Sequence, residues 1–197
     1  MGNVASHFFA YVSRLRWIKR WGLMRNAIEE NVATHSWEVA TVAHALALIR
    51  NRHFAGTVNA DRVAAAALYH DATEVITGDM PTPVKYHSRV MREAFGDIEH
   101  KAEAELLALL PEDLREDFSP YVRESRLGPE EKELIKAADR LSAWLKCRAE
   151  LRAGNPEFGP AEQQIRARLE ADGLPEVQYF LEVFAPGYDQ PLDNLLG

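Results

Sequence analysis

The chain has 197 residues, of which 47% are hydrophobic and 27% charged, a mixture that is typical of a globular protein rather than a disordered one. Its 30 acidic side chains outnumber its 23 Lys and Arg residues. The resulting net charge of −7 argues against a nucleic-acid partner, because phosphate binding draws mainly on basic side chains. Cys147 is the only cysteine, so no internal disulfide can form, and a reducing compartment is the simpler expectation.

Nothing in the chain predicts export or membrane insertion. The apolar residues near the N-terminus are interrupted by Ser13, Arg14 and Arg16, whereas a secretory leader needs an unbroken apolar core. The longest apolar runs are far shorter than the roughly 20 residues of a membrane-spanning helix. We therefore expect a cytoplasmic protein with no membrane partner.

Apolar residues recur at helical spacing from the start of the chain. The first helix is expected to begin after Ser6, its candidate N-cap, and to carry the apolar stripe Phe8, Val12, Leu15 and Ile18. Thr34 is the expected cap of the second helix, whose stripe consists of Val39, Val42, Leu46 and Ile49. Residues 60–72 predict an Ala-rich third helix that ends near His70 and Asp71.

The helical pattern continues in the second half of the chain. After a breaker from Gly78 to Pro83, a long helical region carries Ile98, Ala102, Leu106 and Leu109. Pro111 and Pro129 stand where helices can begin, because the first helical position tolerates a missing N–H. The helix from Pro129 carries the apolar stripe Leu134, Ala138, Leu141 and Leu145. Two shorter helices follow, with Ile165 and Leu169 and then with Val177, Phe180, Leu181 and Phe184.

Strand-like alternation of apolar and polar residues is nearly absent, and no internal repeat is found. The stretch 154–159 is long enough for a loop but too short for an interdomain linker. The sequence therefore predicts a single compact all-α domain that comprises residues 1–197.

The adjacent pair His70 and Asp71 is the first candidate for chemistry. An imidazole nitrogen and a carboxylate oxygen together suit a divalent transition metal. If the helix continues past them, Glu74 lies on the same face, close enough to accept a proton from a water molecule at the metal. The structural alternative is that the histidine merely complements the dipole at the end of its helix.

His35 and Asp139 are ambiguous when taken alone. His35 falls in a first helical turn, where an ordinary surface residue is the simpler interpretation. Asp139 falls at the border of the apolar face of its helix, where a solvated carboxylate is common.

Two polar segments could bind a substrate. Prolines stiffen the loop from Asp79 to Pro83, and a stiff loop after a candidate metal helix can hold a reacting group, although it can also be a plain turn. Arg20 and Trp21, just past the first helix, could clamp a phosphate and stack on a sugar or base, or could form a surface pair.

Taken in order, His35, His70-Asp71 and Asp139 resemble the H…HD…D pattern of the HD-domain metal-dependent phosphohydrolases, which are all-helical proteins. Within that superfamily the chain resembles the bacterial HD-domain 5'-deoxynucleotidases of the YfbR type over nearly its whole length. The matching segments are SHFFAYVSRL at 6–15, RW at 20–21, LMRN at 23–26, ENV at 30–32, HDATEVITGDMPTPVK at 70–85, AAD at 137–139 and LKC at 145–147. The D-x-P-T-P-V-K stretch and the Arg-Trp pair are the specific parts, because generic HD proteins lack them. Met80 stands where an apolar residue, commonly Leu, is expected.

The resemblance implies a homodimeric enzyme that removes the phosphate from 2'-deoxyribonucleoside 5'-monophosphates and discriminates against ribonucleotides. It implies a divalent metal such as cobalt, manganese or copper. The metal ligands that it implies are His35, His70, Asp71 and Asp139.

The resemblance also implies roles for the remaining residues. Glu74 and Asp79 would be the catalytic carboxylates. From the chemistry of the reaction we expect Glu74 to be the base, and Asp79 to be either the acid for the departing O5' or a ligand of the sugar hydroxyl. Arg20 would orient the phosphate, and Lys85 is a weaker candidate for the same task. The nucleoside would be held by Trp21, Asp79, Met80, Pro81 and Thr82.

Two other functions stay open. One is another HD-domain phosphohydrolase, which would act on deoxynucleoside triphosphates or cyclic nucleotides. The other is a non-catalytic helical regulatory dimer, in which the His-Asp pair is incidental and no divalent ion binds in stoichiometric amount.

Overall fold

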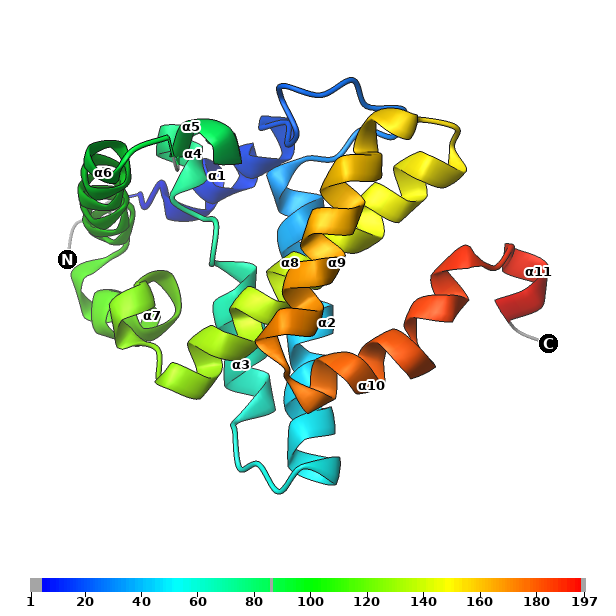
Figure 1. The fold of residues 1–197 in the computed structure, drawn as a ribbon. Coiled ribbons are helices and arrows are strands. Elements are labelled where there is room, and N and C mark those ends of the chain that lie inside the picture. Colours follow the sequence, from blue (N-terminus) through cyan, green and yellow to red (C-terminus); the bar gives the residue numbers. More distant parts are fainter. Residues whose placement is uncertain (1–4, 86, 196–197) are drawn as a thin grey trace. The chain divides into compact units, whose positions relative to one another are not determined.

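The structure is a computed structural model that describes residues 5–85 and 87–195 (Figure 1). All regular elements of these residues are helices, and their one β-type pairing is an isolated antiparallel bridge between Lys19 and Asn31. The predicted all-α fold is therefore confirmed. No helix of the described residues combines the length and the apolar character needed to cross a membrane.

The chain packs as two compact units, which we describe separately. The first consists of the residues up to Arg25, Glu29–Trp37 and Ala65–Gly128, and the second of Asn26–Ile28, Glu38–Ala64 and the residues from Pro129 on. That the whole chain behaves as one domain stays a prediction.

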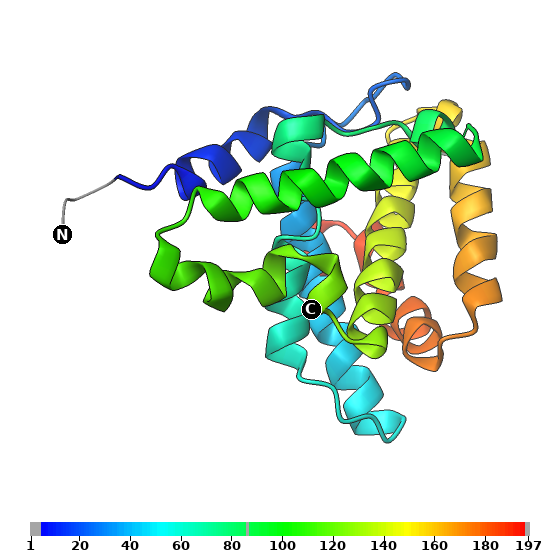
Figure 2. The same ribbon diagram turned by 90° about the vertical axis from the view of Figure 1, so that its left-hand side faces the viewer.

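The first unit is built around one apolar cluster. Its elements are α1 (Phe8–Val12), η1 (Ser13–Trp17), α4 (Glu74–Thr77), α5 (Thr82–Lys85), α6 (Arg89–Ala108), η2 (Glu112–Leu114), α7 (Arg115–Val122) and η3 (Glu124–Arg126), together with the start of α2 (Val32–His53) and the end of α3 (Ala60–Leu68). Figure 2 shows α6 as a long green helix, after which the chain turns back into α7. The core cluster is Phe8, Ala72, Leu106, Leu107, Leu110 and Val122. Since Ala72 is fully buried there, the core anchors the turn between α3 and α4.

The second unit packs around α8 (Pro129–Arg152). Its other elements are the greater part of α2, the start of α3, η4 (Pro156–Phe158), α9 (Gly159–Asp172), α10 (Pro175–Val183), η5 (Ala185–Asp189) and α11 (Leu192–Leu195). The predicted stripe of the Pro129 helix is buried, as Leu134, Ala138, Leu141 and Leu145 show. Glu150, also fully buried on α8, pairs with Lys146 and accepts hydrogen bonds from the backbone N–H groups of Ala27 (2.9 Å) and Ile28 (3.0 Å). These partners offset the cost of burying a charge.

The predicted cap of the first helix was wrong, because the N-cap of α1 is His7 and not Ser6.

Two further local predictions were wrong in detail. Helix α2 begins at Val32, so Asn31 and not Thr34 is its cap. The Asn31 side chain accepts a hydrogen bond from the Thr34 N–H (3.0 Å), while the Asn31 N–H donates to the Thr34 hydroxyl (3.3 Å), which is the reciprocal arrangement of a capping box. Helix α3 ends at Leu68 rather than at residue 72, so Glu74 does not continue it but begins α4.

Candidate active site

Three of the predicted metal ligands form a cluster in the first unit. His35 comes from the first turn of α2, and His70 and Asp71 come from the turn between α3 and α4. One ligand atom from each of them can be chosen so that all three lie within 4.8 Å of one another. The His35 side chain is fully buried, and the other two are mostly buried.

Nitrogen atoms converge on one carboxylate oxygen of this cluster. Oδ2 of Asp71 lies 3.1 Å from Nε2 of His70 and 3.7 Å from Nε2 of His35. Nδ1 of His70 lies 2.8 Å from the Ala67 carbonyl oxygen, which can only accept a hydrogen bond, so Nδ1 carries a proton and the ring is held with Nε2 toward the cluster. Two imidazoles and one carboxylate are a donor set that suits a divalent transition metal. The residues present therefore fit such an ion.

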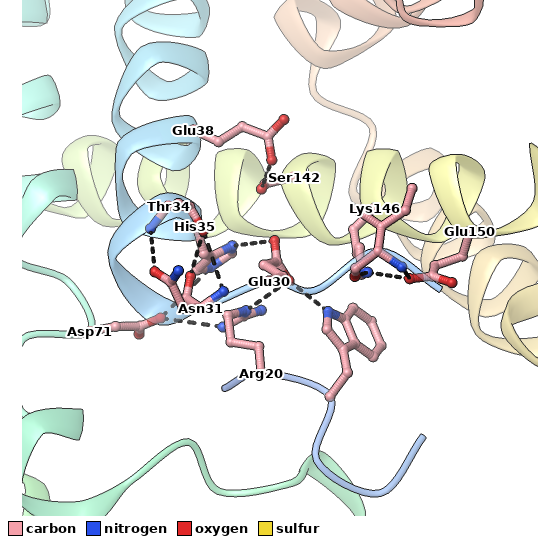
Figure 3. Close-up of polar contacts among 12 residues, drawn as sticks. Arg20, Glu30, Asn31, Thr34, His35, Glu38, Asp71, Ser142, Lys146 and Glu150 are labelled. Atoms are coloured by element: carbon pink, nitrogen blue, oxygen red, sulfur yellow. Dashed lines mark hydrogen bonds and ion pairs between the residues drawn. The ribbon is translucent and has the colours of Figure 1, made fainter. Parts of the chain in front are cut away.

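Arg20 and Trp21 lie in a loop whose two ends pair with each other, residues 18–20 with residues 30–32. The Arg20 N–H donates to the Glu30 carbonyl (3.1 Å), and the Val32 N–H donates to the Ile18 carbonyl (3.0 Å). This pairing brings Nη1 of Arg20 to 3.5 Å from Oδ2 of Asp71, as Figure 3 shows. A guanidinium is thus placed beside the candidate metal ligands.

Trp21 has an unusual backbone conformation. Its φ of 60° lies in the left-handed region, which is a strained conformation for a bulky aromatic residue. Its backbone N–H donates to the carboxylate of Asp79, and its indole Nε1 donates to Oε2 of Glu30 at 2.7 Å. Hydrogen bonds to two carboxylates therefore hold the residue in this conformation.

The two predicted catalytic carboxylates lie in the same unit. Burial, together with the neighbouring charges of Asp71 and Asp79, raises the pKa of Glu74 to about 9. Oε2 of Glu74 is buried and has no hydrogen-bond partner among the described residues. Burial also raises the pKa of Asp79, with a further contribution from Asp71. Gly78, whose φ is 71°, provides the left-handed turn between α4 and Asp79.

Asp71 differs electrostatically from these two carboxylates. Burial alone would raise its pKa, but His70, His35 and Arg20 hold it well below its ordinary value. Asp71 therefore stays ionised, as a metal ligand must, whereas the pKa values of Glu74 and Asp79 are shifted in the opposite direction.

The remaining predicted site residues lie on α5, on α8 and in the loop before α5. The Lys85 ammonium lies 2.8 Å from Oε1 of Glu99 and 4.6 Å from the centre of the Phe95 ring, so its charge is directed to α6. Asp139 is half-buried on α8, which belongs to the second unit, and its place in a metal site stays a prediction. In the loop before and into α5, Met80 and Pro81 are half-buried and Thr82 is exposed.

Sequence reasoning missed Glu30. Its carboxylate accepts hydrogen bonds from Nε of Arg20 (3.3 Å) and from Nε1 of Trp21 (2.7 Å), and its Oε1 lies 3.8 Å from Nδ1 of His35. In the sequence, only the family resemblance marks the segment ENV at 30–32. Its contacts depend on the back-folding of the loop, which has no periodic sequence pattern.

Comparisons with solved structures identify the fold. The fold is that of the HD-domain phosphohydrolases: a solved structure of such a protein from Listeria innocua matches with a TM-score of 0.79, at 24% identity over 92% of this chain and 88% of that one. A cyanophage S-2L HD phosphohydrolase, solved with dA and one catalytic Zn²⁺ ion, matches with a TM-score of 0.62, at 21% identity over 90% of this chain and 95% of that one.

Sequence comparisons assign the chain to a narrower family within the HD-domain phosphohydrolases. The family model described as 5'-deoxynucleotidase YfbR-like matches residues 7–188. The 5'-deoxynucleotidase YfbR of Shigella boydii serotype 18 is 52% identical over 190 residues, which are 96% of each chain. The chain belongs to the YfbR-like family, as the sequence motifs predicted.

Proposed function

We propose that the protein is a metal-dependent phosphohydrolase that removes the phosphate from 2'-deoxyribonucleoside 5'-monophosphates. The observation that carries the proposal is the convergence of His35, His70 and Arg20 on one oxygen of Asp71, in a chain that is 52% identical to a named 5'-deoxynucleotidase. Such a site combines ligands for a cation with a guanidinium for a phosphate.

His35, His70 and Asp71, with Asp139 as the fourth ligand, would hold a divalent cation. When bound, the cation would lower the pKa of a water molecule and of the carboxyl groups around it, and would offset the charge of the phosphate. Cobalt, manganese and copper are the ions that the family resemblance implies. The Zn²⁺ in the cyanophage structure adds a further candidate.

The side chains around the cluster would divide the remaining work. Arg20 would bind two oxygens of the phosphate with its planar fork of N–H donors. Glu74 would accept the proton of the attacking water, and Asp79, which burial favours in its protonated form, would donate a proton to the departing O5'. In the alternative role, Asp79 would bind the sugar hydroxyl.

Trp21 and the loop residues Met80, Pro81 and Thr82 would hold the nucleoside. An indole that presses on the 2' position would strip water from a ribose hydroxyl without offering it a hydrogen bond, which favours deoxyribose. Lys85 remains a second candidate for phosphate contact, for which its ammonium would have to leave Glu99.

The proposal includes a homodimer in the cytoplasm. The dimer rests on the family resemblance alone, and the compartment on the absence of any possible internal disulfide. The net charge of −7 supports a small-molecule substrate over a nucleic acid.

The decisive experiment measures phosphate release from matched deoxy- and ribonucleoside 5'-monophosphates, with and without a chelator. We expect release from the deoxy substrates only, lost on chelation and restored by divalent cations. Deoxynucleoside triphosphates and cyclic nucleotides serve as competing substrates, and faster turnover of either would overturn the proposal. A purified protein without any stoichiometric divalent ion and without phosphatase activity would favour the regulatory dimer.

A further inference from the structure

The mostly buried carboxylate of Glu30 lies next to three groups of the site at once. Oε2 accepts hydrogen bonds from the indole of Trp21 and from Nε of Arg20, while Oε1 lies 3.8 Å from Nδ1 of His35 (Figure 3). The side chains of Arg20 and Glu30 are only 13% and 10% exposed, so solvent screens these contacts little. The Glu30 carbonyl also accepts the Arg20 N–H, which fixes the two residues in register.

We propose that Glu30 is a positioning residue that orients the phosphate-binding, nucleoside-binding and metal-binding groups of the site together. The inference rests on the proposed function for the roles of Arg20 and Trp21. Glu30 itself contacts neither the substrate nor the reacting atoms, and it acts through the side chains that do.

Each contact has a distinct physical effect. Because Nε of Arg20 is turned to Glu30, the terminal nitrogens are directed to the cluster, where Nη1 lies 3.5 Å from Asp71. The bond to the indole holds Trp21 in its left-handed conformation, which costs free energy unless neighbouring groups stabilise it. The carboxylate also lies 3.8 Å from Nδ1 of His35, so its charge favours the orientation in which the other ring nitrogen faces Asp71.

The chain offers a matched control for this role. Glu29 is the adjacent residue of the same type, but its side chain is 77% exposed and pairs with Lys19 at the surface. Glu29→Ala and Glu30→Ala therefore make the same chemical change in the same loop. Glu30→Gln keeps the shape of the side chain and an acceptor oxygen for the indole, so it guards against a simple folding defect.

A first readout is independent of activity. In a ¹⁵N-labelled protein the indole N–H resonance of Trp21, assigned by its loss in Trp21→Phe, should shift upfield and exchange faster with solvent in Glu30→Ala. Glu29→Ala should leave it in place, and Glu30→Gln should shift it less. Calorimetric titration of chelator-treated protein with Mn²⁺ should show roughly tenfold weaker binding for Glu30→Ala, the usual effect of removing such a carboxylate.

A second readout separates positioning from catalysis. For a deoxynucleoside monophosphate, Glu30→Ala should raise KM about tenfold or more. The loss in kcat/KM should be non-additive with that of Arg20→Ala. Once the guanidinium has been removed, removing the carboxylate that orients it has little further effect. Glu30→Gln should recover part of the KM effect, since its amide oxygen still accepts from the indole.

The outcomes separate a failure of the positioning role of Glu30 from a failure of the proposed function. If Glu30→Ala matches Glu29→Ala in the indole resonance, the Mn²⁺ affinity and KM, the positioning role is refuted. Full additivity with Arg20→Ala would refute the action through Arg20. If the wild-type protein hydrolyses no deoxynucleotide while the resonance and the Mn²⁺ affinity still change, the proposed function fails and the positioning of Trp21 and His35 stands.

Discussion

Replacing Glu74 by Gln should stabilise the chelator-treated protein at neutral pH. The folded protein holds the Glu74 proton with a pKa of about 9, against 4.5 for an unperturbed glutamate. Because the folded state binds the proton more tightly than the unfolded chain, the stability that this group contributes is complete below about pH 4.5. It is lost progressively as the pH rises toward 9. An uncharged amide at this position does not titrate.

The expected size of the effect follows from these two values. Each pH unit between them costs roughly 1.4 kcal/mol of unfolding free energy, so at pH 7 the wild-type protein has lost about 3 kcal/mol relative to acid conditions through this carboxyl. The difference between Glu74→Gln and wild type should therefore grow in favour of the variant from pH 5 to pH 8. Asp79 titrates in both proteins and cancels from the difference in the first approximation.

Urea denaturation at several pH values, with a chelator present, measures this difference. Glu105→Gln, an exposed substitution on α6, makes the same chemical change without burial and serves as the control. A free-energy difference that is independent of pH for Glu74→Gln would show that the carboxyl is not held protonated by its surroundings. It would also remove the electrostatic basis for treating Glu74 as distinct from Asp71.

Three further predictions concern single contacts. Arg20→Lys keeps the charge but loses the fork of donors, so kcat/KM for a deoxynucleoside monophosphate should fall by roughly 10- to 100-fold in a phosphate-release assay. Asp71→Asn should abolish stoichiometric binding of Mn²⁺, as measured by calorimetry, because the ionised ligand is lost. Phe8→Ala should lower the unfolding free energy by about 3–5 kcal/mol in urea, since Phe8 is fully buried, whereas Phe9→Ala, at a residue that is 61% exposed, should cost much less.

The sequence predicted the fold class well because helical periodicity reports burial directly. Phe8, Leu106 and the stripe of the Pro129 helix all lie in the cores of their units, as their spacing indicated. Boundaries were predicted less well. Asn31 and Thr34 can each cap a helix, and only the three-dimensional structure shows that the two bond reciprocally, with Asn31 as the cap.

For the site, motif order predicted the cluster of His35, His70 and Asp71, but spacing alone did not. The contribution of Glu30 was missed for a related reason. Its three contacts depend on a loop that pairs residues 18–20 with 30–32, and neither periodicity nor composition marks such a pairing. Irregular backbone is where sequence patterns carry least information about contacts, and this site is built mostly from irregular backbone.

The early end of α3 illustrates why the site needs such backbone. Consecutive residues of an α-helix point about 100° apart, so His70 and Asp71 in a continuous helix would direct their ligand atoms to different places. Because the helix ends at Leu68, the turn that follows lets Nε2 of His70 approach Oδ2 of Asp71 to 3.1 Å. The buried Ala72 then holds this turn against the core, and Glu74 begins a separate short helix with its carboxyl among the same charges. A helix that continued to residue 72, as the Ala-rich pattern suggested, would separate the two ligands that the motif places side by side.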